Sequence, residues 1–244
     1  MYYLRTGSLQ TGTPLFQKLV GGRGHYLFPE REIAKDWASS DVYEKSLIDW
    51  CCENFAVPEK DCLDIGAHCG TYSMELAQKA RRVHSFECSP KTFNYLCANI
   101  ALQGLDGKIV PYNVALGDTA GTLQYYLRSE DGGGNGCCQF EADRLKGTPS
   151  IPVEVRTLDS YNFQNISFIK IDVEGFEQQV LMGGRQMLEN NGYPKILFES
   201  WPSSKDSENI PATKLRADLF EFLKGLGYKI TTLNGYDNMF LAEQ

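Results

Sequence analysis

The stretch Cys62-Leu63-Asp64-Ile65-Gly66-Ala67-His68-Cys69-Gly70 decides the fold, because an apolar run leads directly into a glycine-rich turn. The run 62–65 predicts a buried strand, and residues 70–80 predict the helix that follows it. Gly66 allows a sharp turn, and Gly70 allows the helix to begin close to a bound ligand, since neither residue has a Cβ atom. A strand, a glycine turn and a helix in this order predict a ligand crevice at the edge of an open α/β sheet.

The glycine spacing separates two adenosine ligands. The fingerprint G-x-G-x-x-G, which brings the backbone up to the pyrophosphate of NAD, is absent because the glycines stand at 66 and 70. S-adenosylmethionine (SAM) has no phosphate, and its ammonium and sulfonium groups suit a neighbouring acid such as Asp64. Glu87 follows Asp64 by 23 positions, where a carboxylate can accept hydrogen bonds from both hydroxyls of a ribose. NAD and SAM share that ribose, so Glu87 does not choose between them.

Short apolar runs alternate with amphipathic segments after the turn, and Ser89-Pro90 supplies an N-cap and a first-turn proline for one helix. This rhythm predicts a doubly wound, mostly parallel, Rossmann-like sheet with helices on both faces. Asn234-Gly235 is a favoured hairpin turn, so the sheet of seven strands is expected to close with an antiparallel pair, 228–233 and 239–242. The other predicted strands are 62–65, 83–86, 108–112, 168–173 and 195–198, and the predicted helices are 70–80, 90–103, one that ends at Leu188 and one from Thr213 to about Gly225.

One domain with an N-terminal extension is expected from 244 residues. Residues 1–57 are interpreted as a flap and a helix packed on the main domain, which takes residues 58–244. The main domain carries an insertion at about 121–157 that is predicted to contain an antiparallel pair of strands. The loop at about 129–150 is either a lid over a substrate or a surface excursion.

Composition and charge argue against several classes of protein. A formal charge of −7 opposes a partner held by phosphate contacts, so no nucleic acid is expected. The chain begins without an apolar signal-peptide core, and no run approaches the ~20 apolar residues of a membrane span, so a cytoplasmic protein is expected. The eight cysteines include no C-x-x-C pair and are interpreted as free thiols, not as a zinc site. Nothing in the sequence indicates the oligomeric state.

Three acids lie at the edge where open α/β sheets bind ligands. Alternation along the predicted strand 168–173 places Asp172 and Glu174 on one side of the extended chain at its end, and Glu199 follows the predicted strand 195–198. An aliphatic alcohol keeps its proton at neutral pH, and a carboxylate that accepts this proton during attack typically contributes about 10²–10⁴-fold. Asp172 and Glu199 can alternatively hold Mg²⁺ or Mn²⁺, which lowers the pKa of a bound hydroxyl. Lys170 is interpreted as a structural ion-pair partner and not as the base.

Several of these segments together resemble the FkbM-type SAM-dependent methyltransferases, which have the class I methyltransferase fold. The most specific are Asp64–Gly70 and Phe168-Ile169-Lys170-Ile171-Asp172-Val173-Glu174-Gly175-Phe176-Glu177. The resemblance covers about residues 60–200. Supporting segments are Phe86-Glu87, Asn113-Val114-Ala115-Leu116-Gly117, Thr157-Leu158-Asp159, Val180-Leu181 with Gly183, and Leu197-Phe198-Glu199.

The resemblance implies an O-methyltransferase that moves the methyl group of SAM to a hydroxyl of a small molecule, and we favour a sugar or glycan acceptor. His68 would touch the ligand or the acceptor, which makes it a catalytic candidate beside the three acids. The implied cofactor contacts are Asp64, Gly66 and Gly70 at the methionine end, Glu87 at the ribose, Asn113, Val114 and Ala115 at the adenine, with Ala67, His68, Cys88 and Asp172 as further contacts.

Three other functions stay open on the sequence. A SAM-dependent enzyme that methylates nitrogen or a carboxylate would not need a strong base. A nicotinamide-linked oxidoreductase is opposed by the glycine spacing and the closing hairpin. A non-catalytic module would bind SAM without turnover. Outside the acids, His84, Tyr72 and Trp201 are interpreted as packing residues.

Overall fold

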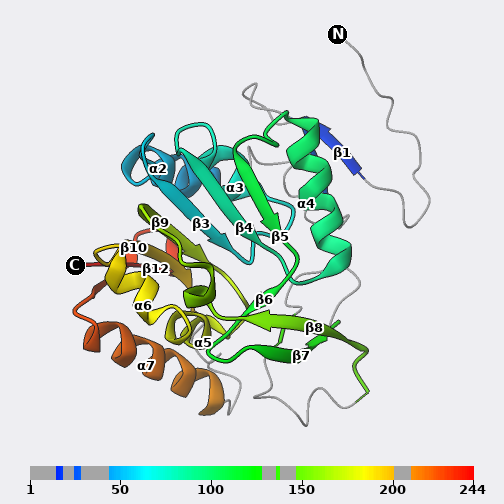
Figure 1. Cartoon of the computed structure of the whole chain (residues 1–244). Helices are drawn as coiled ribbons and strands as arrows, with labels where there is room; N and C mark the ends of the chain where they lie inside the picture. The colour runs from blue at the N-terminus through cyan, green and yellow to red at the C-terminus, as the bar shows by residue number, and fades with distance from the viewer. Residues whose placement is uncertain (1–14, 19–24, 29–43, 128–135, 138–146, 201–209) are drawn as a thin grey trace.

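The computed structural model describes residues 15–18, 25–28, 44–127, 136–137, 147–200 and 210–244. Figure 1 shows a central sheet with helices on both of its faces. The strand order in this sheet is β11-β12-β10-β9-β3-β4-β5. Its strands are β3 Asp61–Ile65, β4 Arg82–Phe86, β5 Ile109–Tyr112, β9 Ile166–Ile171, β10 Lys195–Glu199, β11 Lys229–Leu233 and β12 Tyr236–Glu243.

Strand pairing in the central sheet has the predicted form. β3, β4, β5, β9 and β10 run parallel, whereas β12 is antiparallel to β10 and β11 is antiparallel to β12. The doubly wound, seven-stranded sheet that ends in an antiparallel hairpin is therefore confirmed. All five residues of β3 are buried, because both faces of this central strand are covered. We call the edge where the parallel strands end the carboxyl edge, and the opposite edge the amino edge.

Two apolar cores lie on the two faces of the sheet. α2, α3 and α4 cover one face, and α5, α6 and α7 cover the other (Figure 1). The predicted cap of α4 is confirmed, since Ser89 Oγ accepts a hydrogen bond from Thr92 N at 3.3 Å. The last helix begins at Ile210, three residues before the predicted cap Thr213. The helices are α2 Lys45–Asn54, α3 Thr71–Leu76, α4 Pro90–Leu102, α5 Glu177–Met182, α6 Arg185–Asn190 and α7 Ile210–Gly225.

The helix predicted to end at Leu188 is instead two short helices, α5 and α6. The backbone between them approaches the insertion closely, since a Cβ atom at Gly183 would lie 2.0 Å from the carbonyl oxygen of Gly117. The second helix then has its own cap, because the Asp159 carboxylate accepts a hydrogen bond from Met187 N at 2.7 Å. The sequence pattern did not show this break because the apolar positions on both sides keep facing the same core.

The insertion forms a second sheet of three strands in the order β6-β8-β7. β7 and β8 pair antiparallel, which confirms the predicted pair, and the short β6 pairs with β8 in parallel. Tyr126 N donates to Gly136 O at 2.9 Å, so residues 136–137 lie against β7. The elements are β6 Ala115–Leu116, β7 Gly121–Tyr126, β8 Ser150–Arg156 and the 3-10 helix η1 Leu158–Tyr161.

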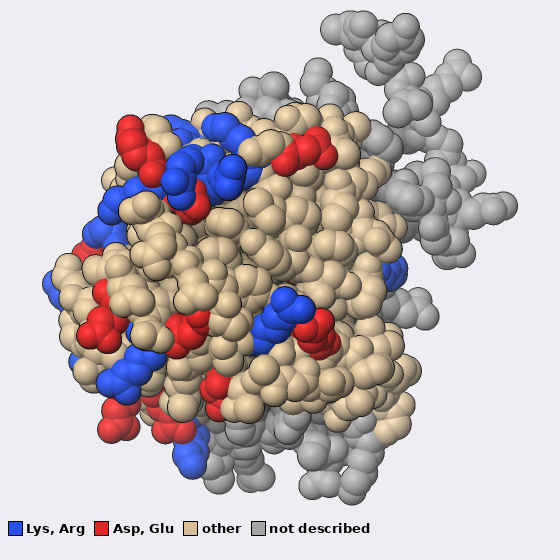
Figure 2. All heavy atoms as spheres, in the orientation of Figure 1, with Lys and Arg blue, Asp and Glu red and all other residues tan. Residues whose placement is uncertain are grey.

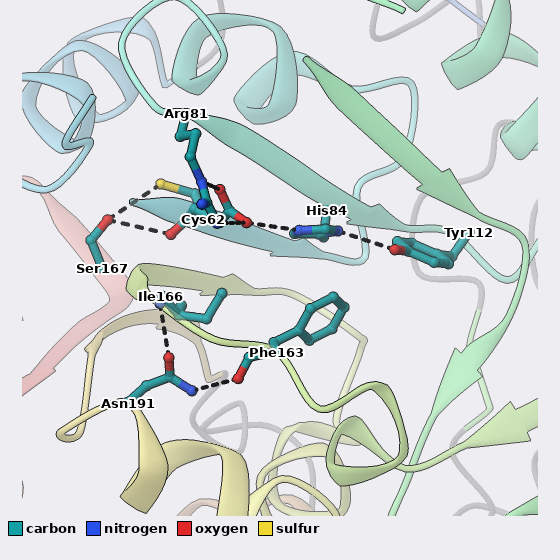
Figure 3. A network of polar contacts seen from close by, with 9 residues as sticks. Cys62, Arg81, His84, Tyr112, Phe163, Ile166, Ser167 and Asn191 are labelled. Carbon is teal, nitrogen blue, oxygen red and sulfur yellow. Dashed lines mark hydrogen bonds and ion pairs between the residues drawn. The ribbon is translucent and has the colours of Figure 1, made fainter. Parts of the chain in front are cut away.

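A row of polar side chains runs from Asp61 at the amino edge, across His84 within β4, to Tyr112 at the end of β5. The Asp61 carboxylate accepts hydrogen bonds from Arg81 Nε at 2.7 Å and Nη2 at 2.9 Å, and it lies 3.2 Å from His84 Nε2. The other ring nitrogen of His84 lies 3.1 Å from the Tyr112 hydroxyl, so this histidine is packed and bonded as predicted. Figure 3 shows Arg81, His84 and Tyr112 in this row, with Asn191 bonded to a neighbouring loop.

Two short strands precede α2 in the chain. β1 Leu15–Lys18 and β2 His25–Phe28 pair antiparallel. The Asn99 side chain on α4 joins β2 to the glycine turn, because its Nδ2 donates to Leu27 O at 3.0 Å and to Cys69 O at 2.8 Å. β2 is therefore linked through Asn99 to the turn at the edge of the predicted ligand crevice.

Candidate functional site

The glycine turn follows β3 and lies against the carboxyl end of β9. Gly66 has φ +76°, and a Cβ atom there would lie 1.7 Å from the carbonyl oxygen of Asp172. The Asp172 N–H donates to Ile65 O at 2.9 Å, which fixes the end of β9 beside the turn. Gly70 has φ +93° and is the N-cap of α3. Both positions therefore require glycine, as the sequence indicated.

Glu87 lies buried just beyond β4, and two backbone N–H groups hold its carboxylate. His68 N donates to Oε2 at 3.0 Å, and Ser89 N donates to Oε1 at 2.8 Å. Burial raises the pKa of Glu87, although His68 and these N–H groups oppose the shift. Each carboxylate oxygen has a second acceptor position. Glu87 can therefore accept two ribose hydroxyls while its own orientation stays fixed.

A cavity that is partly open to solvent lies beside Glu87. Its walls are the ends of β3 and β4, the segment after β5, the loop after β9, and the insertion. Tyr125, Gly136 and Cys137 of the insertion line the cavity, whereas most of the loop at about 129–150 lies outside the described residues. The lining residues are Ile65, Gly66, Phe86, Glu87, Cys88, Val114, Ala115, Leu116, Tyr125, Gly136, Cys137, Asp172, Val173, Glu174 and Phe176.

The predicted cofactor contacts divide into those that line this cavity and those that do not. Asn113 supports the wall, since its amide donates to the carbonyl oxygens of Glu87 at 2.8 Å and Cys88 at 3.2 Å. Gly66, Glu87, Cys88, Val114, Ala115 and Asp172 line the cavity, whereas Asp64, Ala67, His68, Gly70 and Asn113 are not among its lining residues.

Lys170 is 5% exposed and lies beside the glycine turn. Its Nζ donates to Asp172 Oδ2 at 3.2 Å and to Gly66 O at 3.3 Å. Burial alone would lower the pKa of Lys170, but the carboxylates of Asp172, Asp64 and Glu44 outweigh burial and raise it. Lys170 therefore stays protonated and pairs with Asp172, in agreement with its predicted structural role.

Asp64 is 1% exposed, and only one of its carboxylate oxygens has a partner in the described part of the chain. Ser73 Oγ donates to Oδ2, and the same hydroxyl lies 2.7 Å from Ser85 Oγ. Burial raises the pKa of Asp64, although Lys170 opposes the shift. A buried acceptor without a donor costs free energy, which a ligand ammonium would offset. The unpartnered Oδ1 of Asp64 thus fits the amino-acid end of SAM, as Glu87 fits its ribose.

The acids after β9 do not keep the predicted alternation. The strand ends at Ile171, and Glu174 has φ +55°, so Asp172, Val173 and Glu174 all reach the cavity. A residue other than glycine at positive φ is strained, and such strain concentrates at binding sites. Asp172 and Glu174 are therefore brought to one cavity, although by a bend and not by a strand face.

The other two catalytic candidates lie differently. Glu199 ends β10 opposite Met239 and is not among the lining residues. His68 has φ +52° and contributes its backbone N–H to Glu87. Within the described ranges, no group of three or more His, Cys, Asp and Glu side chains is arranged to hold a metal ion. A metal at Asp172 and Glu199 stays a prediction.

Surface charge is mixed on the face shown in Figure 2, where acidic and basic side chains lie near one another with uncharged surface between them. Arg81, of the only adjacent basic pair, is bonded to Asp61, and Arg82 is exposed. That nucleic acid is not a partner stays a prediction. No helix among the described residues has the length and apolar character needed to cross a bilayer.

Sequence reasoning missed two parts of this site. Tyr125 and Cys137 come from the insertion; alternation along 121–126 indicates which residues face inward, but not that they face a cavity. The second is Glu44, which is not among the lining residues but accepts a hydrogen bond from the Tyr72 hydroxyl at 2.8 Å, beside the glycine turn. Tyr72 itself is buried, as expected of a packing residue. Trp201 and the side chain of His25 lie outside the described residues.

Most of the chain matches a known protein family. A family model described as "Methyltransferase FkbM domain" matches residues 64–230. The chain is also 24% identical over 233 residues to the hexuronic acid methyltransferase AglP of Haloferax volcanii, with 95% of this chain and 88% of that protein covered. The family match begins inside β3, so Glu44 and α2 precede it.

Two solved structures share the fold. A Staphylococcus aureus protein assigned as a caffeoyl-CoA O-methyltransferase aligns with a TM-score of 0.52 at 16% identity, over 86% of this chain and 90% of that chain. An O-methyltransferase from Bacillus cereus in complex with S-adenosylhomocysteine (SAH) aligns with a TM-score of 0.50 at 15% identity, over 86% and 87%. At these identities the likeness shows the fold, which is the expected class I sheet.

Proposed function

Because this chain belongs to the FkbM family of SAM-dependent methyltransferases, we propose that it transfers the methyl group of SAM to a hydroxyl of a sugar. One observation carries the proposal: the ribose-binding candidate Glu87 and the acids Asp172 and Glu174 border the same cavity. The donor and a carboxylate base can therefore meet there. The H. volcanii relative acts on a hexuronic acid, which supports a sugar as the acceptor.

We assign the donor to the cavity by the chemistry of its walls. Glu87 accepts the ribose hydroxyls, and apolar residues such as Val114 and Ala115 pack against the adenine. Asp64 accepts a hydrogen bond from the ammonium group at the glycine turn. These contacts orient the bound SAM, which supplies an electrophilic methyl group on its sulfonium.

Asp172 is the proposed base. Its side chain is 35% exposed, so an acceptor can reach it, and Lys170 holds one of its oxygens in place. The acceptor oxygen bonds to the methyl carbon as its proton passes to Asp172, and sulfur keeps the electron pair of the broken bond. Glu174 lies at the same wall and is proposed to hold a second hydroxyl of the sugar. A base of this kind contributes about 10²–10⁴-fold.

A second candidate function is methylation of the acceptor's carboxylate. The observation that favours it is the hexuronic acid substrate of the relative, because such a sugar carries a carboxylate beside its hydroxyls. A carboxylate needs no base to attack the methyl group. Asp172 would then be dispensable for turnover.

The test uses two probes of matched shape, 4-nitrophenyl glucoside and 4-nitrophenyl glucuronide, with labelled SAM. We expect labelled product that survives mild alkali, since a methyl ether is stable there and a methyl ester is hydrolysed. Asp172→Asn should lower turnover at least ~100-fold at saturating SAM. Glu154→Gln, at an exposed ion pair on β8, is the control for loss of a carboxylate.

Three results would count against the proposal. An alkali-labile product would show that the acceptor is a carboxylate. Full activity of Asp172→Asn would show that Asp172 is not the base. SAM binding without turnover on any sugar tested would favour the non-catalytic SAM-binding module. Parallel reactions with Mg²⁺, Mn²⁺ or EDTA decide whether the metal predicted at Asp172 and Glu199 is required.

A further inference from the structure

Glu44, the residue before α2, reaches the glycine turn from a segment that the family match does not cover. It is the N-cap of α2 with φ 58°, a conformation that is unfavourable for glutamate. Its Oε2 accepts a hydrogen bond from the Tyr72 hydroxyl at 2.8 Å, and Tyr72 lies in the first turn of α3, directly after Gly70. This contact brings a carboxylate from the N-terminal extension to the start of α3.

At this position Glu44 belongs to a cluster of charged side chains around Lys170. The Lys170 ammonium lies 5.1 Å from the centre of the Tyr72 ring, on whose hydroxyl Glu44 is bonded. Glu44, Asp64 and Asp172 all favour the charged form of Lys170. We call Glu44, Asp64, Asp172 and Lys170 the turn cluster.

The turn cluster is short of positive charge. With all groups ionised it holds three carboxylates and one ammonium, in a setting where Lys170 and Asp64 are both more than nine-tenths buried. Asp64 Oδ1 is buried without a partner among the described residues, an observation independent of the charge count. Buried carboxylates are stable when paired with cations, and an incompletely paired group favours a ligand that completes the set. The missing group is a cationic donor of hydrogen bonds.

We propose that Glu44 is a donor-binding residue whose carboxylate binds the α-ammonium of SAM, so that the N-terminal extension completes the methionine end of the donor site. The ammonium has three N–H donors, enough for Glu44 and Asp64 together with one further acceptor. Tyr72 positions Glu44 by holding one of its oxygens. The proposal rests on SAM dependence and not on the identity of the acceptor.

Equilibrium binding of two ligands tests this. SAH carries the amino-acid end, whereas 5′-methylthioadenosine has the same nucleoside and sulfur without it. Glu44→Gln should weaken SAH binding about 10-fold or more, as expected for loss of a charge-assisted hydrogen bond, and should leave 5′-methylthioadenosine within 2-fold. Tyr72→Phe should weaken SAH by a smaller factor. Glu53→Gln, on the exposed side of α2, should change neither ligand.

Glu44→Asn guards against misfolding, because asparagine tolerates positive φ and still removes the charge. It should reproduce the selective loss of SAH. Unchanged SAH affinity in Glu44→Gln and Glu44→Asn would overturn the proposal, as would an equal loss for both ligands, which would mark Glu44 as structural. No acceptor is used, so these results are separate from any failure of the sugar assay.

Discussion

Asp61 and Asp64 stand three positions apart on β3, at opposite edges of the sheet, and their surroundings differ. Asp61 is 4% exposed, and both of its oxygens have partners, Arg81 and His84. Asp64 is 1% exposed, and one of its oxygens has no partner among the described residues. One buried acid is therefore satisfied by the protein itself, and the other is not.

The pKa values of the two acids move in opposite directions for this reason. Burial would raise the pKa of Asp61, but hydrogen bonds from Arg81 and His84 outweigh burial and lower it. At Asp64, burial dominates, and Lys170 and Ser73 only reduce the rise. The buried acid at the amino edge is thus paired within the protein, whereas the buried acid at the carboxyl edge has an unpartnered oxygen among the described residues, where we propose that the donor binds.

Alanine substitutions of one glycine at each edge should differ most in their effects. Gly66→Ala should cost about 3 kcal/mol or more and abolish SAM binding, because its Cβ would meet the Asp172 carbonyl at a positive φ. Gly192, between α6 and β10 at the amino edge, has φ +67° with open space around its Cβ position. Gly192→Ala should cost only about 1 kcal/mol and leave SAM binding intact. Urea unfolding and SAM titration of both variants check this, and equal losses would contradict it.

Asp61→Asn should lower the free energy of unfolding at pH 7 by about 2 kcal/mol, since Arg81 and His84 lose a charged acceptor. The folded-state pKa of Asp61 is lowered, so its contribution is present above the unfolded-state pKa and is lost as pH falls through the folded-state value. The variant should therefore lose less stability than the wild type on acidification. If the free energies of unfolding of Asp61→Asn and the wild type fall in parallel as pH falls, Asp61 does not contribute this pH-dependent stability.

Glu177 should make stability depend on pH in the opposite direction to Asp61, with a smaller effect. Burial raises its pKa to about 7, although its Oε1 accepts hydrogen bonds from Val173 N and Gly175 N. The unfolded chain releases this proton near pH 4.3, so stability is fully present below that value and is lost as pH rises toward 7. Glu177→Gln keeps the acceptor and removes the charge. Between pH 6 and 8 the wild type should lose on the order of 1–2 kcal/mol relative to the variant in denaturant unfolding, and identical pH dependences would refute this.

The sequence predicted the elements that depend on local pattern. The run 62–65, the glycines at 66 and 70 and the Asn234-Gly235 hairpin each have a local physical requirement, and the structure places all of them as expected. The position of Glu87 could also be predicted, because one helix and one strand of ordinary length separate it from the glycine turn.

What the sequence could not predict depends on contacts between distant segments. Glu44 meets Tyr72 only through the packing of α2 on α3, and no periodicity relates the two. Tyr125 lines the cavity because the insertion folds back over the carboxyl edge. The break at Gly183 follows from a close approach to Gly117, which lies on a different element. Each of these depends on tertiary geometry, so local signals such as the Gly183-Gly184 pair or the alternation along 121–126 do not identify the distant partner.

Titration calorimetry of SAM into Asp64→Asn and Asp61→Asn, each measured beside the wild type, tests most directly whether incompletely paired acids at the carboxyl edge bind the donor. Asp64→Asn should weaken SAM about 10-fold or more, because a charged acceptor for the ammonium is lost, and its fold should be retained. Asp61→Asn should bind SAM within 2-fold of the wild type despite its lower stability. Equal affinities for all three proteins, or a selective loss in Asp61→Asn, would show that the incompletely paired acid at the carboxyl edge does not bind the donor.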